Sequence, residues 1–249
     1  MKSFGLLAVC ASLLLSLSVP AASALNVPEK LIYDVSWTGV KSATTVYEVT
    51  AKGDDLHFVS TTRSIPWMAT FFPVDDRAES IVTRGDGDRF GTPKYYRQRN
   101  NQGSHRSNRE AHFDPVRLKV EARDLLKKTE KTEVISSRTY DSLSCIYFVR
   151  TLALVPGKPL YFDMYDGKKL WTAEVRVLRR EEVTTPLGRF KTLVVRPLLR
   201  DADGAPPRSG ELTIWLTDDE LRIPVMMITK AKVGKITATL VGGSYWPQS

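Results

Sequence analysis

The sequence predicts an all-β protein, mainly antiparallel, in which a large curved sheet or open β-barrel of roughly ten strands wraps around one buried helix. The first observation is a stretch between Gly210 and Gly243 in which apolar residues recur at every second position. Such alternation is typical of strands with one buried face and not of helices. The second is the short polar turns between such runs, and the third is a single helix-like segment. The runs are Leu212, Ile214 and Leu216, then Ile223, Val225 and Met227, then Ile236, Ala238 and Leu240.

The first residues have the pattern of a secretory signal peptide. Lys2 precedes an apolar run from Phe4 to Leu17, and small residues occupy positions 22–24. We expect cleavage after Ala24, with a signal peptide at 1–24 and a single mainly-β periplasmic domain at 25–249. A membrane anchor would need ~20 apolar residues, and this run is interrupted early. No other segment is long and apolar enough to span a bilayer, so we do not expect an integral membrane protein.

Strand signals begin soon after this site. Residues 31–37 alternate, with Leu31, Tyr33, Val35 and Trp37 on one face. Two further strand-like runs, 43–51 and 56–63, are joined by Lys52-Gly53-Asp54-Asp55, which is a hairpin signal.

Residues 65–73 interrupt the strands with a short aromatic segment between two prolines. The segment is too short for a stable helix by itself, yet it holds Trp67, Met68, Phe71 and Phe72. One interpretation is an apolar plug packed under the sheet. The other is a mobile apolar flap over a ligand cavity, in which Trp67, Phe71 and Phe72, together with Trp37, would bind the ligand.

Residues 94–109 are polar and basic, and follow a predicted strand at 76–84. The purely structural interpretation is a long polar hairpin with one solvent-exposed face. The alternative is a docking surface for phosphate or carboxylate groups. Its candidate residues are Arg97, Arg99, Arg106 and Arg109. Further on, we interpret residues 127–131 as a charged linker.

The best helix candidate is Asp141 to Leu154, with Asp141 as N-cap and a Pro-Gly pair after its end. Its apolar residues lie nearly all round, which predicts burial against the inner face of the sheet. A buried Arg150 then needs a carboxylate or several carbonyl oxygens as partners. Asp219 is the first candidate and Glu182 the second. We expect Arg150, Asp219 and Arg222 to form a structural ion pair that fixes the helix to the C-terminal strands.

The remaining segments continue the strand pattern. A hairpin is predicted from 160–164 and 170–178, a second from 182–199, and residues 201–210 read as an exposed loop. Pro224 lacks an amide donor, so its strand should lie at an edge or contain a bulge.

Residues with catalytic potential are few. His57, His105 and His112 are scattered, and no metal-ligand spacing, phosphate loop or dinucleotide motif occurs. Ser142 and Ser144 lack the glycines of a nucleophile elbow. Cys145 lies within the apolar helix, where a small buried hydrophobe is the ordinary role. We therefore expect no enzyme, no catalytic residues, no metal and no cofactor.

The chain is basic, with a formal net charge of +8 at pH 7. Basic surfaces attract acidic partners, such as anionic lipid head groups or polyanionic envelope polymers. Nucleic acid is the other common partner of a basic protein, but the export signal argues against it.

Several motifs together resemble one family, the domain-of-unknown-function family numbered 3108, which comprises exported proteins of Gram-negative bacteria. The resemblance implies a periplasmic location and no established activity, so no functional residues are carried over. The motifs are residues 72–80 (FPVDDRAES), 141–150 (DSLSCIYFVR), Gly157, 182–190 (EVTTPLGRF) and 214–225 (IWLTDDELRIPV).

Three functional hypotheses follow. The first is a non-enzymatic periplasmic protein of the cell envelope that binds an amphiphilic ligand or client: a lipid, a lipoprotein or an outer-membrane protein precursor. The second is a surface-acting accessory protein for assembly of outer-membrane machinery, with the basic hairpin as its contact. The third is an uncharacterised hydrolase.

Overall fold

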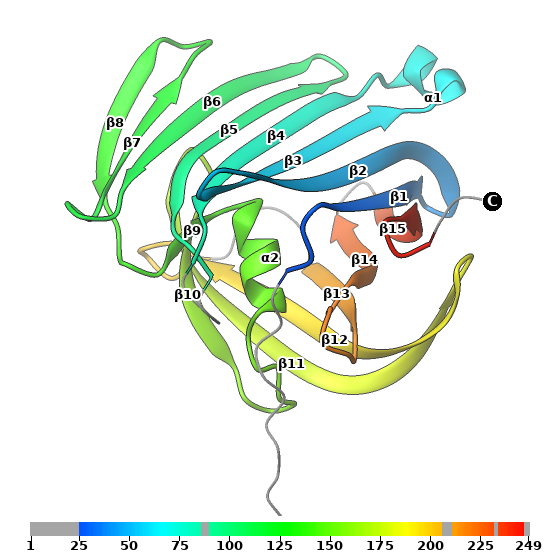
Figure 1. Ribbon diagram of the computed structural model, residues 1–249. Helices are drawn as coiled ribbons and strands as arrows, with labels where there is room; N and C mark the ends of the chain where they lie inside the picture. The colour runs from blue at the N-terminus through cyan, green and yellow to red at the C-terminus, as the bar shows by residue number, and fades with distance from the viewer. Residues whose placement is uncertain (1–24, 86–89, 206–210, 232–233, 247–249) are drawn as a thin grey trace, which may run out of the picture.

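A computed structural model describes residues 25–85, 90–205, 211–231 and 234–246 (Figure 1). The predicted signal peptide, 1–24, lies outside the described residues. Within them, no helix is long and apolar enough to cross a membrane. The elements are β1 (Glu29–Trp37), β2 (Val40–Lys52), β3 (Asp55–Ser64), α1 (Pro66–Phe71), β4 (Asp75–Thr83), β5 (Pro93–Gln102), β6 (His105–Asp114), β7 (Lys119–Asp124), β8 (Thr129–Val134), β9 (Thr139–Asp141), α2 (Ser144–Arg150), β10 (Leu160–Tyr165), β11 (Leu170–Thr185), β12 (Gly188–Arg200), β13 (Glu211–Thr217), β14 (Pro224–Ala231) and β15 (Gly234–Gly243).

All described strands belong to one 15-stranded sheet. Its order is β8-β7-β6-β5-β4-β3-β2-β1-β15-β14-β13-β12-β11-β10-β9, and only β9 and β10 run parallel. The first and last strands pair in the middle of the sheet, so both halves depend on the β1–β15 ladder. The sheet curves strongly but is not closed into a barrel, because β8 and β9 are its two edges.

The all-β, mainly antiparallel prediction is confirmed, but the count of roughly ten strands is too low. The missing strands lie mainly in the polar region from β5 to β8. Strand β8 has hardly any apolar residues, which is why the sequence predicts a linker at residues 127–131. In the structure these residues form a turn and the beginning of an edge strand. Two local predictions hold. Lys52 and Asp55 close the β2–β3 hairpin, and a register shift lies beside Pro224.

Helix α2 lies inside the curve of the sheet (Figure 1). Tyr147 contacts Phe58 of β3, with ring centroids 4.6 Å apart. Phe148 stacks on Tyr140 of β9 at 3.9 Å, and its edge meets Phe162 of β10 at 5.2 Å. Neighbouring residues of the helix thus pack against the two halves of the sheet, and such aromatic contacts add to the burial of apolar area.

The helix is half the predicted length, seven residues from Ser144 to Arg150. Asp141 does not cap it directly, because this residue ends β9. Its Oδ1 accepts hydrogen bonds from the amides of Leu143 and Ser144, both at 2.9 Å, and so fixes the turn that leads into the helix. Its Oδ2 accepts from the hydroxyls of Ser80 at 2.6 Å and Ser144 at 2.7 Å. A single buried carboxylate therefore joins α2 to β4.

We expect Asp141→Ala to destabilise the protein by about 3 kcal/mol, because it leaves two amides and two hydroxyls buried without their acceptor. Asp141→Asn keeps the shape and the acceptor oxygen, and rotation of the two hydroxyls can satisfy its amide nitrogen. Urea unfolding at pH 7 should therefore give a much smaller loss for the asparagine variant. Equal losses would contradict the role of the hydrogen bonds.

The same carboxyl should make stability depend on pH. Burial raises the pKa of Asp141 above its usual 3.8, and the hydrogen bonds offset this only in part. A raised pKa means that the folded state binds the proton more tightly than the unfolded state, so stability falls as the pH rises through the raised pKa. Asp141→Asn should remove this component from the pH profile of the urea midpoint.

Candidate functional site

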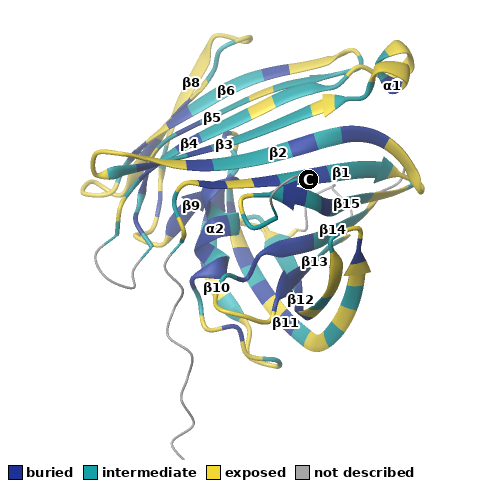
Figure 2. Cartoon of the chain, turned by 45° about the vertical axis from the view of Figure 1, so that its right-hand side comes forward, coloured by how far each residue is buried: buried dark blue, intermediate teal, exposed yellow. Residues whose placement is uncertain are grey.

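The aromatic residues of α1 are exposed to solvent. Pro66 begins the helix at a position where its missing amide costs nothing. Trp67, Phe71 and Phe72 are 47%, 79% and 50% exposed, and Met68 is the buried residue of the helix. The plug interpretation is therefore wrong for the three aromatic residues, since only Met68 packs inward. Figure 2 shows α1 as a mainly exposed projection at one end of the sheet.

A second group of exposed apolar side chains lies at the same end of the sheet. Trp37 pairs with Val40 across the β1–β2 turn and with Ile236 of β15, and all three are exposed. The amide of Ile65 donates to the Ser42 carbonyl at 3.0 Å, so α1 begins beside this turn. We call Trp37, Val40, Trp67, Phe71, Phe72 and Ile236 the aromatic end.

The aromatic end is anchored at two glycines. A Cβ at Gly103 in the β5–β6 turn would lie 2.7 Å from the Phe72 ring, so this ring rests directly on the turn backbone. A Cβ at Gly234 would lie 2.7 Å from Thr38 Oγ1 and 3.2 Å from Trp37 Nε1. Both glycines have positive φ, +54° and +117° respectively, which side chains rarely adopt.

The four arginines of the predicted docking surface do not share one face. Register and alternation place Arg97, Arg99 and Arg106 on the outer face of β5 and β6, and Arg109 on the inner face. Arg97 donates to Asn108 at 3.2 Å, and Arg99 pairs with Asp75 at 3.3 Å.

The other two arginines also have partners. Arg106 donates to the carbonyls of Gly103 and His105, at 2.7 and 2.9 Å. Arg109 pairs with Asp124 of β7 at 3.3 Å. A single anionic docking surface of all four is therefore wrong, because strand alternation directs Arg109 the other way.

The carboxylate partner of Arg150 is Glu29 of β1, not Asp219 or Glu182. Both terminal nitrogens of Arg150 donate to the two carboxylate oxygens of Glu29 at 2.7 Å. Both side chains are almost fully buried. Nε donates to the carbonyl of Leu221, which lies in the turn between β13 and β14, at 3.1 Å. The Tyr245 hydroxyl donates to Glu29 Oε2 at 2.9 Å.

Asp219 and Arg222 form hydrogen bonds with backbone groups near the pair of Glu29 and Arg150. Oδ1 of Asp219 accepts from the amides of Leu221 and Arg222, both at 3.0 Å, and from the Thr217 hydroxyl at 2.6 Å. This oxygen therefore stabilises the turn that positions the Leu221 carbonyl toward Arg150. Arg222 adopts a positive φ of 45° and donates to the Arg150 carbonyl at 2.8 Å, at the end of α2.

A small interior cavity lies beside the ion pair. It is lined by Tyr33, Tyr47, Tyr147 and Arg150, among others, and offers about 10 Å³ to the centre of a water molecule. That is room for about one water and far too little for an acyl chain.

The other candidate chemical groups are not arranged as a site. Burial raises the pKa of the Cys145 thiol, whose Sγ donates to the Ser142 carbonyl at 3.4 Å, so it stays protonated at neutral pH. His105 and His112 alternate onto opposite faces of β6. Among the described residues, no three or more His, Cys, Asp or Glu side chains are grouped to hold a metal ion.

We expect Glu29→Ala to be the most damaging single change at the ion pair, with a loss on the order of 3–5 kcal/mol, because it strands a buried guanidinium. Arg150→Met should cost less than Arg150→Ala, since methionine fills the volume and removes the charge. The double variant Glu29→Gln with Arg150→Met should recover part of the loss of either single change. Urea melts of these variants measure each effect. Negligible losses throughout would mean that the pair does not anchor α2.

The fold resembles that of solved structures from other bacteria. The beta-barrel-like protein of domain of unknown function DUF1849 from Brucella abortus is 15% identical, with a TM-score of 0.61, over 89% of this chain and 98% of that chain. A candidate exported protein with a YmcC-like fold from Bacteroides fragilis is 11% identical, with a TM-score of 0.34, over 90% of this chain and 99% of that chain.

At 15% identity the likeness to the DUF1849 protein shows the fold alone. No protein of curated function matches the chain. A family model described as protein of unknown function (DUF3108) matches residues 32–241, which confirms the resemblance read from the motifs. The chain belongs to the DUF3108 family.

Proposed function

We propose that this protein is a non-enzymatic component of the cell envelope, located in the periplasm, that binds an anionic lipid surface through its aromatic end. The exposure of Trp67 and Phe71 on α1, and of Phe72 directly after it, carries this proposal. A six-residue helix that buries only Met68, and that together with the following Phe72 presents three large rings to solvent, is poorly explained by folding alone. Aromatic side chains are favoured where an apolar medium meets water, at the level of lipid head groups.

The charges around the aromatic end support an anionic surface. Arg106 and Lys235 lie at this end of the sheet and have no carboxylate partner within the described ranges, whereas Glu211 stands opposite Lys230 in the β13–β14 ladder. Asp75 is already paired with Arg63 and Arg99, each at 3.3 Å. A basic rim beside apolar rings is the composition that binds anionic lipids at an interface.

The interior gives less support to binding of a whole lipid molecule. Helix α2 and its aromatic contacts occupy the curve of the sheet, and the cavity beside Arg150 has room for about one water. A surface contact at the aromatic end is therefore the form of amphiphile binding that we propose.

The two other hypotheses have weaker support. An accessory role through the basic hairpin would use Arg97 and Arg99, but Asn108 and Asp75 already accept hydrogen bonds from them. A hydrolase would need an activated nucleophile. Cys145 is held protonated by burial, which raises the pKa of its thiol.

Binding to vesicles tests the proposal. We expect the mature protein to sediment with vesicles of phosphatidylglycerol and phosphatidylcholine, and much less with phosphatidylcholine alone. The double variant Trp67→Ser with Phe71→Ser should weaken binding at least about tenfold, since losing the burial of one aromatic side chain costs ~1.5–3 kcal/mol. Phe72 is left intact because it packs on Gly103.

A matched control is Val116→Ser with Tyr161→Ser, which removes exposed apolar residues from other parts of the chain. This control should bind as the unchanged protein does. Equal binding by the α1 variant, or no binding to either kind of vesicle, would refute the proposal.

A further inference from the structure

A groove lies near the edge strand β8, away from the residues of the proposed lipid contact. It lies between the β7–β8 hairpin and the turn from β10 to β11, and has a volume of about 320 Å³. That is within the usual size of small-ligand sites. Gly167 of this second turn lies against the inner face of β6, where a Cβ would stand 3.7 Å from Arg109 Cβ. The Lys131 ammonium of the edge strand β8 lies 5.8 Å from the ring centroid of Tyr165 in β10, so these two strands come near each other without pairing.

The side chains that line the groove are mainly cationic. Asp124 pairs with Arg109 at 3.3 Å on the inner face of the sheet, whereas strand alternation places the pair of Arg123 and Glu130, 3.0 Å apart, on the outer face. The remaining basic groups are Lys127, Lys131 and Lys168.

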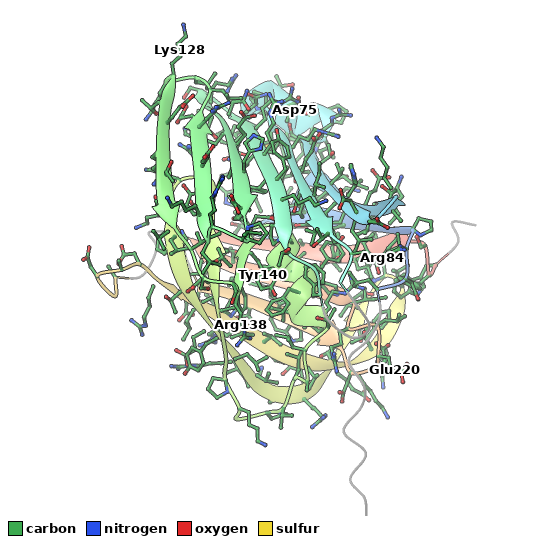
Figure 3. The ribbon with its side chains drawn as sticks, turned by 60° about the vertical axis from the view of Figure 1, so that its left-hand side comes forward. Asp75, Arg84, Lys128, Arg138, Tyr140 and Glu220 are labelled. Carbon is green, nitrogen blue, oxygen red and sulfur yellow. The ribbon has the colours of Figure 1, made fainter. Side chains whose placement is uncertain are left out.

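Two of these lysines have no counter-charge. Lys131 pairs with Glu133, whereas Lys127 and Lys168 have no carboxylate partner in the described part of the chain. Lys128, by contrast, extends from the hairpin tip away from the molecule (Figure 3). Lys127 and Lys168 therefore line opposite walls of the groove without an ion-pair partner, and one aspartate stands in the turn of each, Asp124 and Asp166.

Both lysines sit on turns that an aspartate holds in place. Asp124 Oδ1 accepts from the amides of Leu126 and Lys127, at 3.2 and 3.0 Å. Asp166 Oδ1 accepts from the amides of Lys168 and Lys169, at 2.7 and 2.8 Å. The walls are thus ordered before any ligand arrives, which reduces the entropy cost of binding.

The charge state of Asp124 supports its pairing with Arg109 and not with Lys127. Burial opposes its ionisation, but the Lys127 amide and the Arg109 guanidinium outweigh burial and lower the pKa of the carboxyl. Asp124 therefore stays ionised and paired with Arg109 at neutral pH, and leaves Lys127 available.

We propose that this groove is a binding site for a small polyanion with phosphate or pyrophosphate groups. A phosphate group carries about −1.5 to −2 charges at pH 7 and offers three acceptor oxygens. It can therefore meet ammonium groups from two walls at once, and lysine binds phosphate well as a point charge. The phosphate can belong to a soluble compound or to the head group of a lipid.

Isothermal titration calorimetry with the mature protein tests the site. The probes are inorganic pyrophosphate and sn-glycerol 3-phosphate, in low-salt buffer and again at ~150 mM salt, where charge attraction is screened. We expect saturable binding of pyrophosphate that weakens with salt. The double variant Lys127→Glu with Lys168→Glu should weaken it at least about tenfold, because an attractive pair of charges becomes repulsive.

The control double variant is Lys52→Glu with Lys158→Glu, which changes the net charge equally at exposed positions outside the groove. It should alter the affinity by no more than about twofold, the scale of a general field effect. Competition by phosphatidylglycerol vesicles would identify a head group as the source of the phosphate, whereas binding of soluble anions alone would identify a soluble compound. No saturable binding, or equal losses in both double variants, would overturn the site. Vesicle binding through the aromatic end is tested separately, so the two proposals can fail independently.

Discussion

The structure depends on the buried pair between Glu29 and Arg150. Two charges removed from water cost several kcal/mol each, on the order-of-magnitude scale, and only good geometry compensates for this. Here the guanidinium and carboxylate meet through two parallel hydrogen bonds of 2.7 Å, while the Leu221 carbonyl and the Tyr245 hydroxyl satisfy further groups. The partners come from the first strand, the helix and two segments near the C-terminus. In the folded state the helix is therefore held by residues from both ends of the chain.

The position of α2 divides the inner face of the sheet. Under the helix, one row across the strands reads Val49, Phe58, Ser80, Tyr96 and Ala111, all buried. The next row is more polar and only partly buried, with Ser60, Ala78, Gln98 and Arg109. On the side toward α1, the apolar part of the core along β3 to β6 thus gives way to more polar residues about two residues from the helix, a distance of ~7 Å. Beyond that row lie the turn at Gly103 and α1, where Met68 is buried and the three aromatic rings are not.

Alternation in the sequence predicted the strands that have one apolar face, such as β1 and β13, because burial imposes period two on them. The alternation rule failed for β8. Its residues are almost all exposed, so its side chains show no pattern that indicates the backbone pairing with β7. The need of Arg150 for a buried partner was predictable from the chemistry of the guanidinium. Its partner was not, because Glu29 is 121 residues away, and only the β1–β15 ladder and the curve of the sheet bring it to α2.

Contacts that only the folded sheet creates also decide which positive charges remain without a partner. The sequence pointed to arginines, but guanidinium groups pair readily with carboxylates in a fixed planar geometry, and cross-strand neighbours supply such partners. Arg99 and Arg109 are neutralised in this way by Asp75 and Asp124. The unpaired charge rests on lysines in turns, such as Lys127 and Lys168, where the backbone rather than a carboxylate sets the position. A count of basic residues therefore locates a partner surface poorly in a sheet. The carboxylates that the ladder brings opposite each one decide which charges remain to attract a ligand.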